Sequence, residues 1–447
     1  MKTTRDVPPS LTTRQILAAW WPLAGSWLLM GMELPAISAA MARLPDSTVS
    51  LAAYGGIVFP LALIIEAPII MLLAASTALC GDMASYRLVR RFMAWTAGGL
   101  TLLHVLVAFT PLYDFVVGDI LAAPDAIREP GRWGLMIMTP WTFSIAYRRM
   151  QQGVLIRFGH PHLVGYGTLV RLGANLLVIA LGLTLRRWPG IVVGTAAVAA
   201  GVVSEAVFAG LNVRPILRGP LRAAPPAAAP LTLPAFLHFY IPLALTSLLT
   251  LVAMPIGSGA MGRMPRTIES LAVWPVVTGF VFTLRSVGFA FNEVVVSLLP
   301  RPGAAPALRR FGWRLAAGTS ALLLLLAVTP LGRLWFRHVV AISPDLLTLA
   351  GHGLWLAVPM PALSALQSWY QGTLVYARRT RGITEAVVIY LASSALLLGA
   401  AVAFGRLTGL YAGLGAMVIS TLLQTAWLRW RARAALGWLA ARDLSAA

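Results

Sequence analysis

Charged residues are scarce in this chain of 447 residues, at 11% of the sequence, whereas a typical soluble domain has about 25%. Hydrophobic residues make up 58%, and the mean hydropathy is +0.79. A soluble domain cannot bury that much apolar surface. The composition therefore argues against an ordinary soluble protein and predicts an integral membrane protein.

Cysteine occurs only once, as Cys80, which excludes an intramolecular disulfide and a metal site built from cysteines. The sequence also lacks the patterns GxxxxGK[ST] and HExxH, so it predicts neither a phosphate-binding loop nor a metal centre of that kind. We therefore expect no cofactor and no enzymatic activity. The apolar run that begins near Ile16 is too long for a cleaved signal peptide, and we expect it to remain as a membrane anchor.

Acidic residues number 15 against 35 basic ones, which gives a net charge of +20. A basic chain attracts nucleic acid, but here the basic residues form small clusters between apolar runs rather than one continuous surface. This distribution is typical of charges that set membrane topology, and we expect no nucleic-acid partner. With the N-terminus placed in the cytoplasm, cytoplasmic segments hold 23 of the 35 basic residues and outside segments hold 10.

The apolar runs are continuous and rich in Leu, Ala and Val, as expected for membrane-spanning helices of about 20 residues. The sequence predicts about twelve of them in an all-α polytopic protein. The predicted helices are 16–41, 51–78, 92–113, 132–156, 162–185, 189–213, 234–261, 269–298, 312–332, 350–376, 383–404 and 408–430. An even number of spans places both termini in the cytoplasm, and we expect a bacterial-type inner membrane.

An internal repeat relates the two halves of the chain. Residues 21–54 align without a gap on residues 241–274 at an offset of 220, with matching prolines at 22, 35 and 45. Farther on, Gln152-Gly153 matches Gln371-Gly372 at an offset of 219. The repeat predicts a six-helix bundle over 1–213, a Pro/Ala-rich cytoplasmic linker over 214–233 and a parallel six-helix bundle over 234–447. This plan is typical of transporters that alternate access between two bundles.

The chain resembles the superfamily of multidrug, oligosaccharidyl-lipid and polysaccharide exporters, which includes the MATE transporters. Within it, the sequence looks most like the progressive ankylosis proteins. The resemblance rests on the Pro22-Leu23 opening of the first helix with Glu33 later in it, on LAAYG at 51–55 and on Glu66-Ala67-Pro68. It implies a V-shaped cavity between the bundles and export of small anionic metabolites such as citrate, pyrophosphate or nucleotides.

Ionisable side chains at membrane depth are costly and usually face a cavity or a partner. Glu33 lies two residues before Pro35, which removes a backbone hydrogen bond and bends the helix. We expect an equivalent bend at Pro255. Glu33 could couple transport to an ion or bind substrate, as MATE-type transporters place a coupling carboxylate in this helix, or it could serve only as a structural hydrogen-bonding group. Its repeat partner is Ala253, so the fold itself does not require the acid.

Glu66 and Arg285 form the sharpest pair of candidates. At an offset of 220, Glu66 matches Ser286 and Ile65 matches Arg285, so an acid and a base lie at similar depth in equivalent helices. They could form an ion pair that breaks when substrate or a proton arrives. Alternatively, Arg285 stays free for an anionic substrate, because a guanidinium remains charged and matches carboxylate and phosphate groups.

The remaining deep charges lie in the fourth, fifth, sixth and eighth spans. We expect Arg171 to pair with Glu205 for structure. Arg148 and Arg149 either anchor the cytoplasmic end of their helix or line an electropositive inner vestibule, which Glu293 could gate or cap. His104 is interpreted as a packing residue rather than a proton shuttle, although its ordinary pKa of about 6.5 suits either role.

Three transport hypotheses remain. The leading one is export of a small anion, supported by deep arginines that meet few deep acids. The second is a proton- or sodium-coupled exporter of organic cations that uses Glu33, Glu66 and Glu205. The third is a flippase for a lipid-linked sugar. A monomer in the lipid bilayer is sufficient for each of them.

Overall fold

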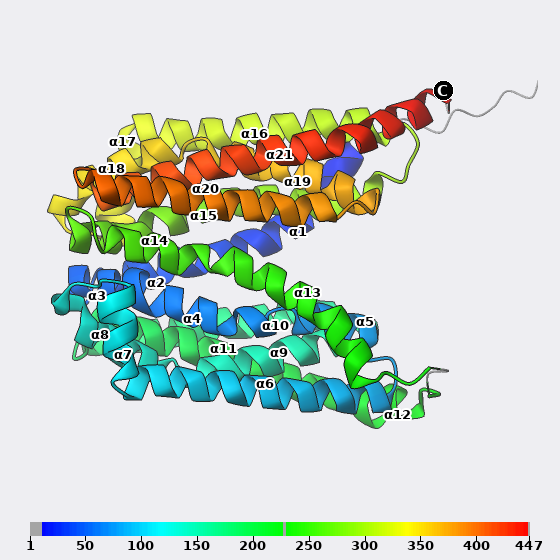
Figure 1. Cartoon of the computed structure of the whole chain (residues 1–447), viewed down its shortest axis with the longest axis horizontal. Helices are drawn as coiled ribbons and strands as arrows, with labels where there is room; N and C mark the ends of the chain where they lie inside the picture. Colours follow the sequence, from blue (N-terminus) through cyan, green and yellow to red (C-terminus); the bar gives the residue numbers. More distant parts are fainter. Residues whose placement is uncertain (1–10, 227–228, 446–447) are drawn as a thin grey trace, which may run out of the picture.

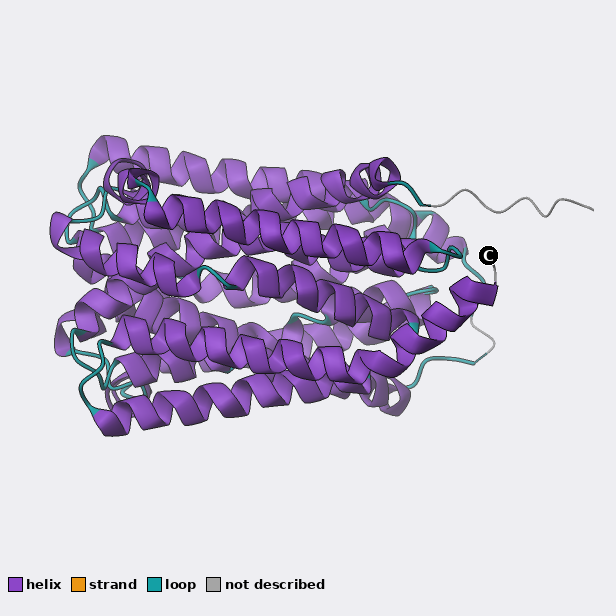
Figure 2. Ribbon diagram, turned by 90° about the horizontal axis from the view of Figure 1, so that it is seen from above, coloured by secondary structure: helices purple, strands orange, loops and turns teal. Residues whose placement is uncertain are grey.

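Helices form almost all of the computed structural model, which describes residues 11–226 and 229–445 (Figure 2). Eleven helical segments in these ranges are long and apolar enough to cross a membrane. The predicted span 132–156 is also helical, as α8 (Asp125–Ile137) and α9 (Thr139–Arg157), but α9 is far more polar than the other spans. The prediction of an all-α polytopic protein is confirmed.

The helices of each half follow the order expected from the repeat (Figure 1). The first half contains, besides α8 and α9, α1 (Thr13–Gly31), α2 (Glu33–Met41), α3 (Ser47–Ala53), the π-helix η1 (Tyr54–Val58), α4 (Phe59–Glu66), the 3-10 helix η2 (Ala67–Ile69), α5 (Leu72–Leu79), α6 (Met83–Phe109), α7 (Leu112–Asp114), the π-helix η3 (Phe115–Ile120), α10 (His162–Leu185) and α11 (Gly190–Arg218).

The second half follows a short connection that contains α12 (Pro220–Ala223). It consists of α13 (Leu233–Leu251), α14 (Ala253–Met261), α15 (Thr267–Leu298), α16 (Ala304–Val328), α17 (Pro330–Leu334), the π-helix η4 (Trp335–Val340), α18 (Pro344–Ala357), α19 (Met360–Tyr376), α20 (Arg381–Phe404) and α21 (Gly409–Ser445).

The predicted linker 214–233 is helical over most of its first part, because α11 continues to Arg218 and α12 follows. Leu, Arg and Ala favour helix. Pro220 occupies the first position of α12, where its missing N–H has no helical partner to lose. The non-helical connection is therefore shorter than the composition predicted.

Backbone geometry repeats between the two halves. The Gly190 N–H donates to the Pro45 carbonyl at 3.1 Å, and the Gly409 N–H donates to the Pro265 carbonyl at 3.2 Å. Residues with positive φ also recur at equivalent positions. These pairs are Asp46 and Arg266, Ala122 and Ala341, Gly159 and Arg378, and Arg186 and Gly405. The halves therefore share their turns as well as their sequence pattern.

The first spans of the two halves cross over and pack on the opposite half. On α1, the Trp20 indole donates to the Val287 carbonyl at 3.1 Å, and the same ring contacts Phe311. On α13, the Tyr240 hydroxyl donates to the Pro68 carbonyl at 2.6 Å. Trp20 is equivalent to Tyr240, and Pro68 to Val287. The bundle boundaries at 1–213 and 234–447 stay a prediction. In the structure, the first span of each half contacts the other half.

A second reciprocal contact joins the halves at the end of the molecule opposite the start of α1. Nη2 of Arg43 donates to the His338 carbonyl at 2.8 Å, and Nη2 of Arg263 donates to the Asp119 carbonyl at 2.9 Å. Arg43 and Arg263 are repeat partners, and so are Asp119 and His338. Each half thus bonds to the other through the same arginine, and we call these two contacts the arginine latches.

The π-helix η1 explains why the repeat offset changes from 220 to 219 along the chain. The offset is 220 at Trp20 and Tyr240, and 219 at Pro68 and Val287, and η1 lies between these positions. A π-helical turn accommodates one additional residue within a helix, while the equivalent α15 is continuous. Because Glu66 follows η1, its repeat partner is Arg285 itself. The expected match of Glu66 with Ser286 is wrong by one residue.

Both predicted bends coincide with interruptions of a span. α1 ends at Gly31 and α2 begins at Glu33, while α13 ends at Leu251 and α14 begins at Ala253. Pro35 has no N–H to offer the Gly31 carbonyl four residues earlier. The Thr283 hydroxyl of α15 donates to that carbonyl instead, at 2.9 Å. The break beside Glu33 is therefore held by a contact from the other half.

Candidate functional site

Glu205 is the centre of a buried polar network inside the first half. Its side chain, on α11, is 1% exposed. Oε2 accepts a hydrogen bond from Nη1 of Arg148, and Oε1 accepts one from Nε2 of Gln152 at 2.8 Å. Nε of Arg171 lies 3.5 Å from Oε2. The predicted pair of Arg171 and Glu205 is present, and Arg148 is a closer partner of the same carboxylate.

Glu33 extends this network toward α2. Its Oε2 lies 3.0 Å from Nη2 of Arg171, and its Oε1 accepts a hydrogen bond from Nδ2 of Asn175 at 2.7 Å. Gly201 of α11 makes room for Asn175, since a Cβ there would lie 1.8 Å from Oδ1 of Asn175. Arg171 therefore bridges two carboxylates, and neither acid is free to bind a cation without losing an arginine.

Glu66 lies at the end of α4 and is buried, with 4% exposure. Its Oε2 has no hydrogen-bond partner in the described protein. Arg149, Arg148 and Arg171 lie close enough to attract its carboxylate. No direct ion pair joins Glu66 and Arg149 among the described residues. Glu66 is thus a buried acid that positive charges surround but do not neutralise by contact.

Arg285 is the deep charge of the second half, in the middle of α15. Its Nε donates to Oγ of Ser364 on α19 at 2.8 Å, and its guanidinium lies 5.4 Å from the centre of the Phe289 ring. Tyr390 of α20 lies near its guanidinium. In the described part of the chain, Arg285 forms no ion pair with Glu66 or with any other acid. One edge of the guanidinium is therefore fixed while its terminal nitrogens have no acidic partner there.

One of two expectations about the cytoplasmic vestibule differs from the structure, and the other is not tested by it. Arg148 is 6% exposed and bonds to Glu205, so it neither anchors a helix end nor lines an open vestibule. The reason is electrostatic, because the buried carboxylate on α11 needs a positive partner. Glu293 is exposed near the end of α15, and it forms no ion pair with another described residue. Its role as a gate or cap stays a prediction.

The sequence shows Gln367 in place of Arg148, but the sequence reasoning missed the partner of Gln367 in the second half. Nε2 of Gln367 donates to Oε1 of Gln424 at 3.0 Å and to Oγ1 of Thr425 at 3.1 Å. At the offset of 219, Gln367 matches Arg148 and Gln424 matches Glu205. The repeat itself is the signal that identifies this pair, once it is extended past Gln371 to the last helix.

The deep charges of the two halves do not balance in the same way. In the first half, three acids face three arginines, namely Glu33, Glu66 and Glu205 against Arg148, Arg149 and Arg171. In the second half, no described acid pairs with Arg285. The described residues include no group of three or more side chains suited to hold a metal ion. The deep charges of the first half therefore balance, whereas the deep arginine of the second half has no described acid as a partner.

Comparison with solved structures identifies the fold. A MATE-family multidrug resistance transporter of the MOP superfamily in an inward-facing conformation matches with a TM-score of 0.66 at 14% identity, over 93% of this chain and 99% of that chain. The lipid II flippase MurJ in an inward closed conformation matches at 0.61 and 12% identity, over 90% of this chain and 86% of that one.

A third match is a MOP superfamily transporter from Pyrococcus furiosus, described as having a binding pocket of reversed polarity. It reaches a TM-score of 0.59 at 14% identity, over 96% of this chain and 99% of that chain. Comparison with protein-family models and with curated proteins finds no match. The chain is an integral membrane protein, and its fold is that of the MATE-type transporters.

Proposed function

We propose that the chain is an alternating-access secondary transporter that exports small anionic metabolites from the cytoplasm. The class of substrate includes citrate, pyrophosphate and nucleotide-like anions, as the resemblance to the progressive ankylosis proteins implies. Two parallel halves joined by reciprocal contacts suit a motion in which those contacts break and others form. The proposal places both termini in the cytoplasm of a bacterial-type inner membrane.

The observation that carries the proposal is the state of Arg285. Ser364 fixes its Nε at 2.8 Å, while no described acid pairs with the terminal nitrogens. A guanidinium positioned in this way offers two parallel N–H groups to a carboxylate or phosphate. Glu33 and Glu205, the acids that a cationic substrate would need, are already bonded to arginines. The balance of charge therefore favours an anion over a cation.

Glu66 is assigned to ion coupling in this proposal. A buried carboxyl oxygen without a partner is costly unless the group binds a proton or a cation. Glu66 and Arg285 occupy equivalent positions in the two halves. Charges that change at these two residues therefore lie at a similar depth in the membrane. A substrate anion at Arg285 and a proton at Glu66 would together leave the interior close to neutral.

The test is uptake of radiolabelled citrate, pyrophosphate and ATP into proteoliposomes, beside a cationic dye, with and without a proton gradient. The variant is Arg285→Glu, and Arg187→Glu is the control, because it makes the same change of charge at an exposed arginine. We expect Arg285→Glu to lower anion uptake at least tenfold and Arg187→Glu to leave it unchanged. Dye uptake that depends on the gradient and ignores Arg285 would instead support the cation exporter.

The same assay separates coupling from binding. Glu66→Gln is expected to abolish the effect of the proton gradient while anion exchange down its own gradient continues. Loss of both would give Glu66 a structural or binding role instead. Transport of a lipid-linked sugar by the wild type, with no movement of the soluble anions, would support the flippase hypothesis.

A further inference from the structure

We propose that the basic end of the second half holds a binding site for the headgroup of an anionic phospholipid. The site is a pocket of about 610 Å³ between α16, α19 and α21. Five arginines line it: Arg309, Arg310, Arg314, Arg429 and Arg433. We call it the arginine pocket. It lies apart from the polar network and from Arg285, so it is a second site, separate from the one in the proposed function.

The charges of the arginine pocket are not neutralised by the described protein. All five arginines are exposed, and none forms a hydrogen bond or ion pair with another described residue. The lining residues include no acid from the described part of the chain. Five positive charges around one cavity repel each other unless an anion occupies it. The pocket therefore favours a ligand with at least one negative charge.

Aromatic side chains give the pocket a floor and a rim. Trp369 and Tyr370 of α19 line the pocket and are buried, and Tyr370 lies near Arg429 and Arg309. Trp313 of α16 is 52% exposed at the edge. Tryptophan is favoured at the level of lipid headgroups, where its ring meets both apolar chains and polar groups. The pocket thus combines a polar centre with an apolar margin, as a phospholipid does.

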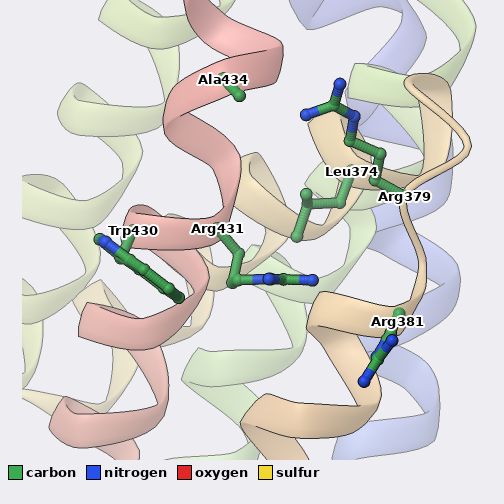
Figure 3. Close-up of a pocket in the computed structure, with 6 residues that line it drawn as sticks. All are labelled: Leu374, Arg379, Arg381, Trp430, Arg431 and Ala434. Atoms are coloured by element: carbon green, nitrogen blue, oxygen red, sulfur yellow. The ribbon is translucent and has the colours of Figure 1, made fainter.

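A neighbouring pocket is lined by three arginines, Arg379, Arg381 and Arg431 (Figure 3), two of which pair with an acid of the protein. Its Arg381 and Arg431 each lie 3.2 Å from Glu385, which also accepts a hydrogen bond from the Trp427 indole. The protein itself supplies the counter-charge there. The arginine pocket lacks such an acid among its described lining residues, and this distinguishes the two clusters on α21.

Position favours a lipid over the transported substrate. α16 and α21 lie along the edge of the molecule opposite α6 (Figure 1). The arginines occupy the start of α16 and the stretch of α21 beside it, at the end of the molecule where the chain's basic clusters gather. Basic pockets between helices on the cytoplasmic side bind anionic headgroups. We therefore assign the pocket to a phospholipid of the cytoplasmic leaflet.

The repeat provides a matched control. Arg90 and Arg91 are the partners of Arg309 and Arg310 at the offset of 219, and both are exposed. The first half has Gly210 in place of Arg429 and Trp95 in place of Arg314, and it keeps Arg214 as the partner of Arg433, so two of the five arginines of the pocket are missing there. Arg309→Gln/Arg310→Gln and Arg90→Gln/Arg91→Gln remove the same charge from equivalent surfaces, and only the first pair belongs to the proposed site.

The experiment is native mass spectrometry of the full chain in detergent, titrated with phosphatidylglycerol or with phosphatidylcholine of the same acyl chains. Each basic side chain near a bilayer contributes about fivefold to binding of an anionic lipid. We expect Arg309→Gln/Arg310→Gln to weaken the tightest phosphatidylglycerol site roughly 30-fold on that basis. The control pair should change it by less than about twofold, since those arginines do not line the pocket. Arg429→Gln/Arg433→Gln should weaken the same site from the other helix.

Three results would overturn the proposal. The first is equal binding of phosphatidylglycerol by the wild type and by both pocket variants. The second is equal binding of phosphatidylcholine. The third is displacement of the lipid by glycerol 3-phosphate at comparable concentrations, which would make the ligand a soluble phosphate compound. Circular dichroism of each variant checks that the helices are retained.

Discussion

The same place in the two halves of the molecule is filled by an ion pair on one side and by neutral amides on the other. Arg148 on α9 bonds to Glu205 on α11, whereas Gln367 on α19 bonds to Gln424 on α21. The helices and the geometry are equivalent, so the fold requires a buried polar contact here but does not require charge. Charge at this position is therefore an addition of the first half.

Two further positions also carry a charged side chain in the first half and an uncharged one in the second. Glu33 matches Ala253, and Arg171 matches Tyr390, so the bridge between carboxylates belongs to the first half. At a further pair of equivalent positions both halves are charged but with opposite sign, because Glu66 matches Arg285. The shared architecture is symmetric while the chemistry is not. The proposed function, in which an ion couples at Glu66 and the substrate binds at Arg285, relies on this asymmetry.

The largest effect is expected from breaking the ion pair on one side only. Arg148→Gln leaves Glu205 buried with Arg171 at 3.5 Å as its remaining positive partner. Removing one member of a buried pair typically costs about 3–5 kcal/mol, and we expect about 3 kcal/mol because Arg171 compensates in part. Thermal unfolding in detergent measures the loss.

The double variant Arg148→Gln/Glu205→Gln turns the first half into a copy of the second at this position. It should recover most of the stability, because Gln367 and Gln424 show that two amides fit between these helices. Equal stability of the single and double variants would mean that the pair is not coupled. In that case the ion pair of the first half and the amide pair of the second could not replace each other.

An intermediate effect is expected from the arginine latches, where the two halves are alike. Both arginines are exposed, so we assign each about 1 kcal/mol. Arg43→Gln/Arg263→Gln should then raise the population in which the halves separate at this end roughly 30-fold. Labelling of Gly259→Cys by a membrane-impermeant maleimide reports that separation, since a Cβ at the buried Gly259 of α14 would lie 3.6 Å from the Ile120 carbonyl of the first half.

The labelling assay has an internal control in the chain. The native Cys80 is buried, and burial raises the pKa of its thiol to about 12, so it remains protonated and unreactive at neutral pH. Arg266→Gln removes a nearby exposed arginine that pairs with Glu269 of α15, at 3.7 Å. An increase of the same size in Arg266→Gln would show that the latches are not specific.

The sequence predicted the spans, their order and the repeat, because each depends on long apolar runs and on paired prolines and glycines. It also predicted the pairing of Arg171 with Glu205 from their similar depth in adjacent helices. What it could not predict is how charges are shared within a bundle. Arg148 and Arg149 are adjacent in sequence, but Arg148 bonds to Glu205 while Arg149 forms no ion pair with a described residue.

The error at Glu66 has a different cause. A one-residue shift within a helix changes the apolar pattern only slightly. The offset of 220 that holds for residues 21–54 therefore does not reveal that it no longer holds at Glu66. The π-helix η1 accommodates the extra residue, and its presence follows from backbone hydrogen bonds rather than from composition. Crossing contacts such as Trp20 with Val287 were likewise invisible, since they depend on how two halves meet in space.

The smallest effect is expected at His104, where the first half again has a polar group and the second half does not. Its ring nitrogens lie 3.0 Å from Oγ1 of Thr142 and 2.9 Å from the Leu135 carbonyl, and its repeat partner is the buried Leu323. His104→Leu should cost about 1 kcal/mol, because the Leu135 carbonyl still accepts a hydrogen bond from the Thr139 hydroxyl while the buried Thr142 hydroxyl loses a partner. Transport and its dependence on the proton gradient should not change. A loss of that dependence with stability intact would make His104 a proton carrier and would place coupling in α6 rather than at Glu66.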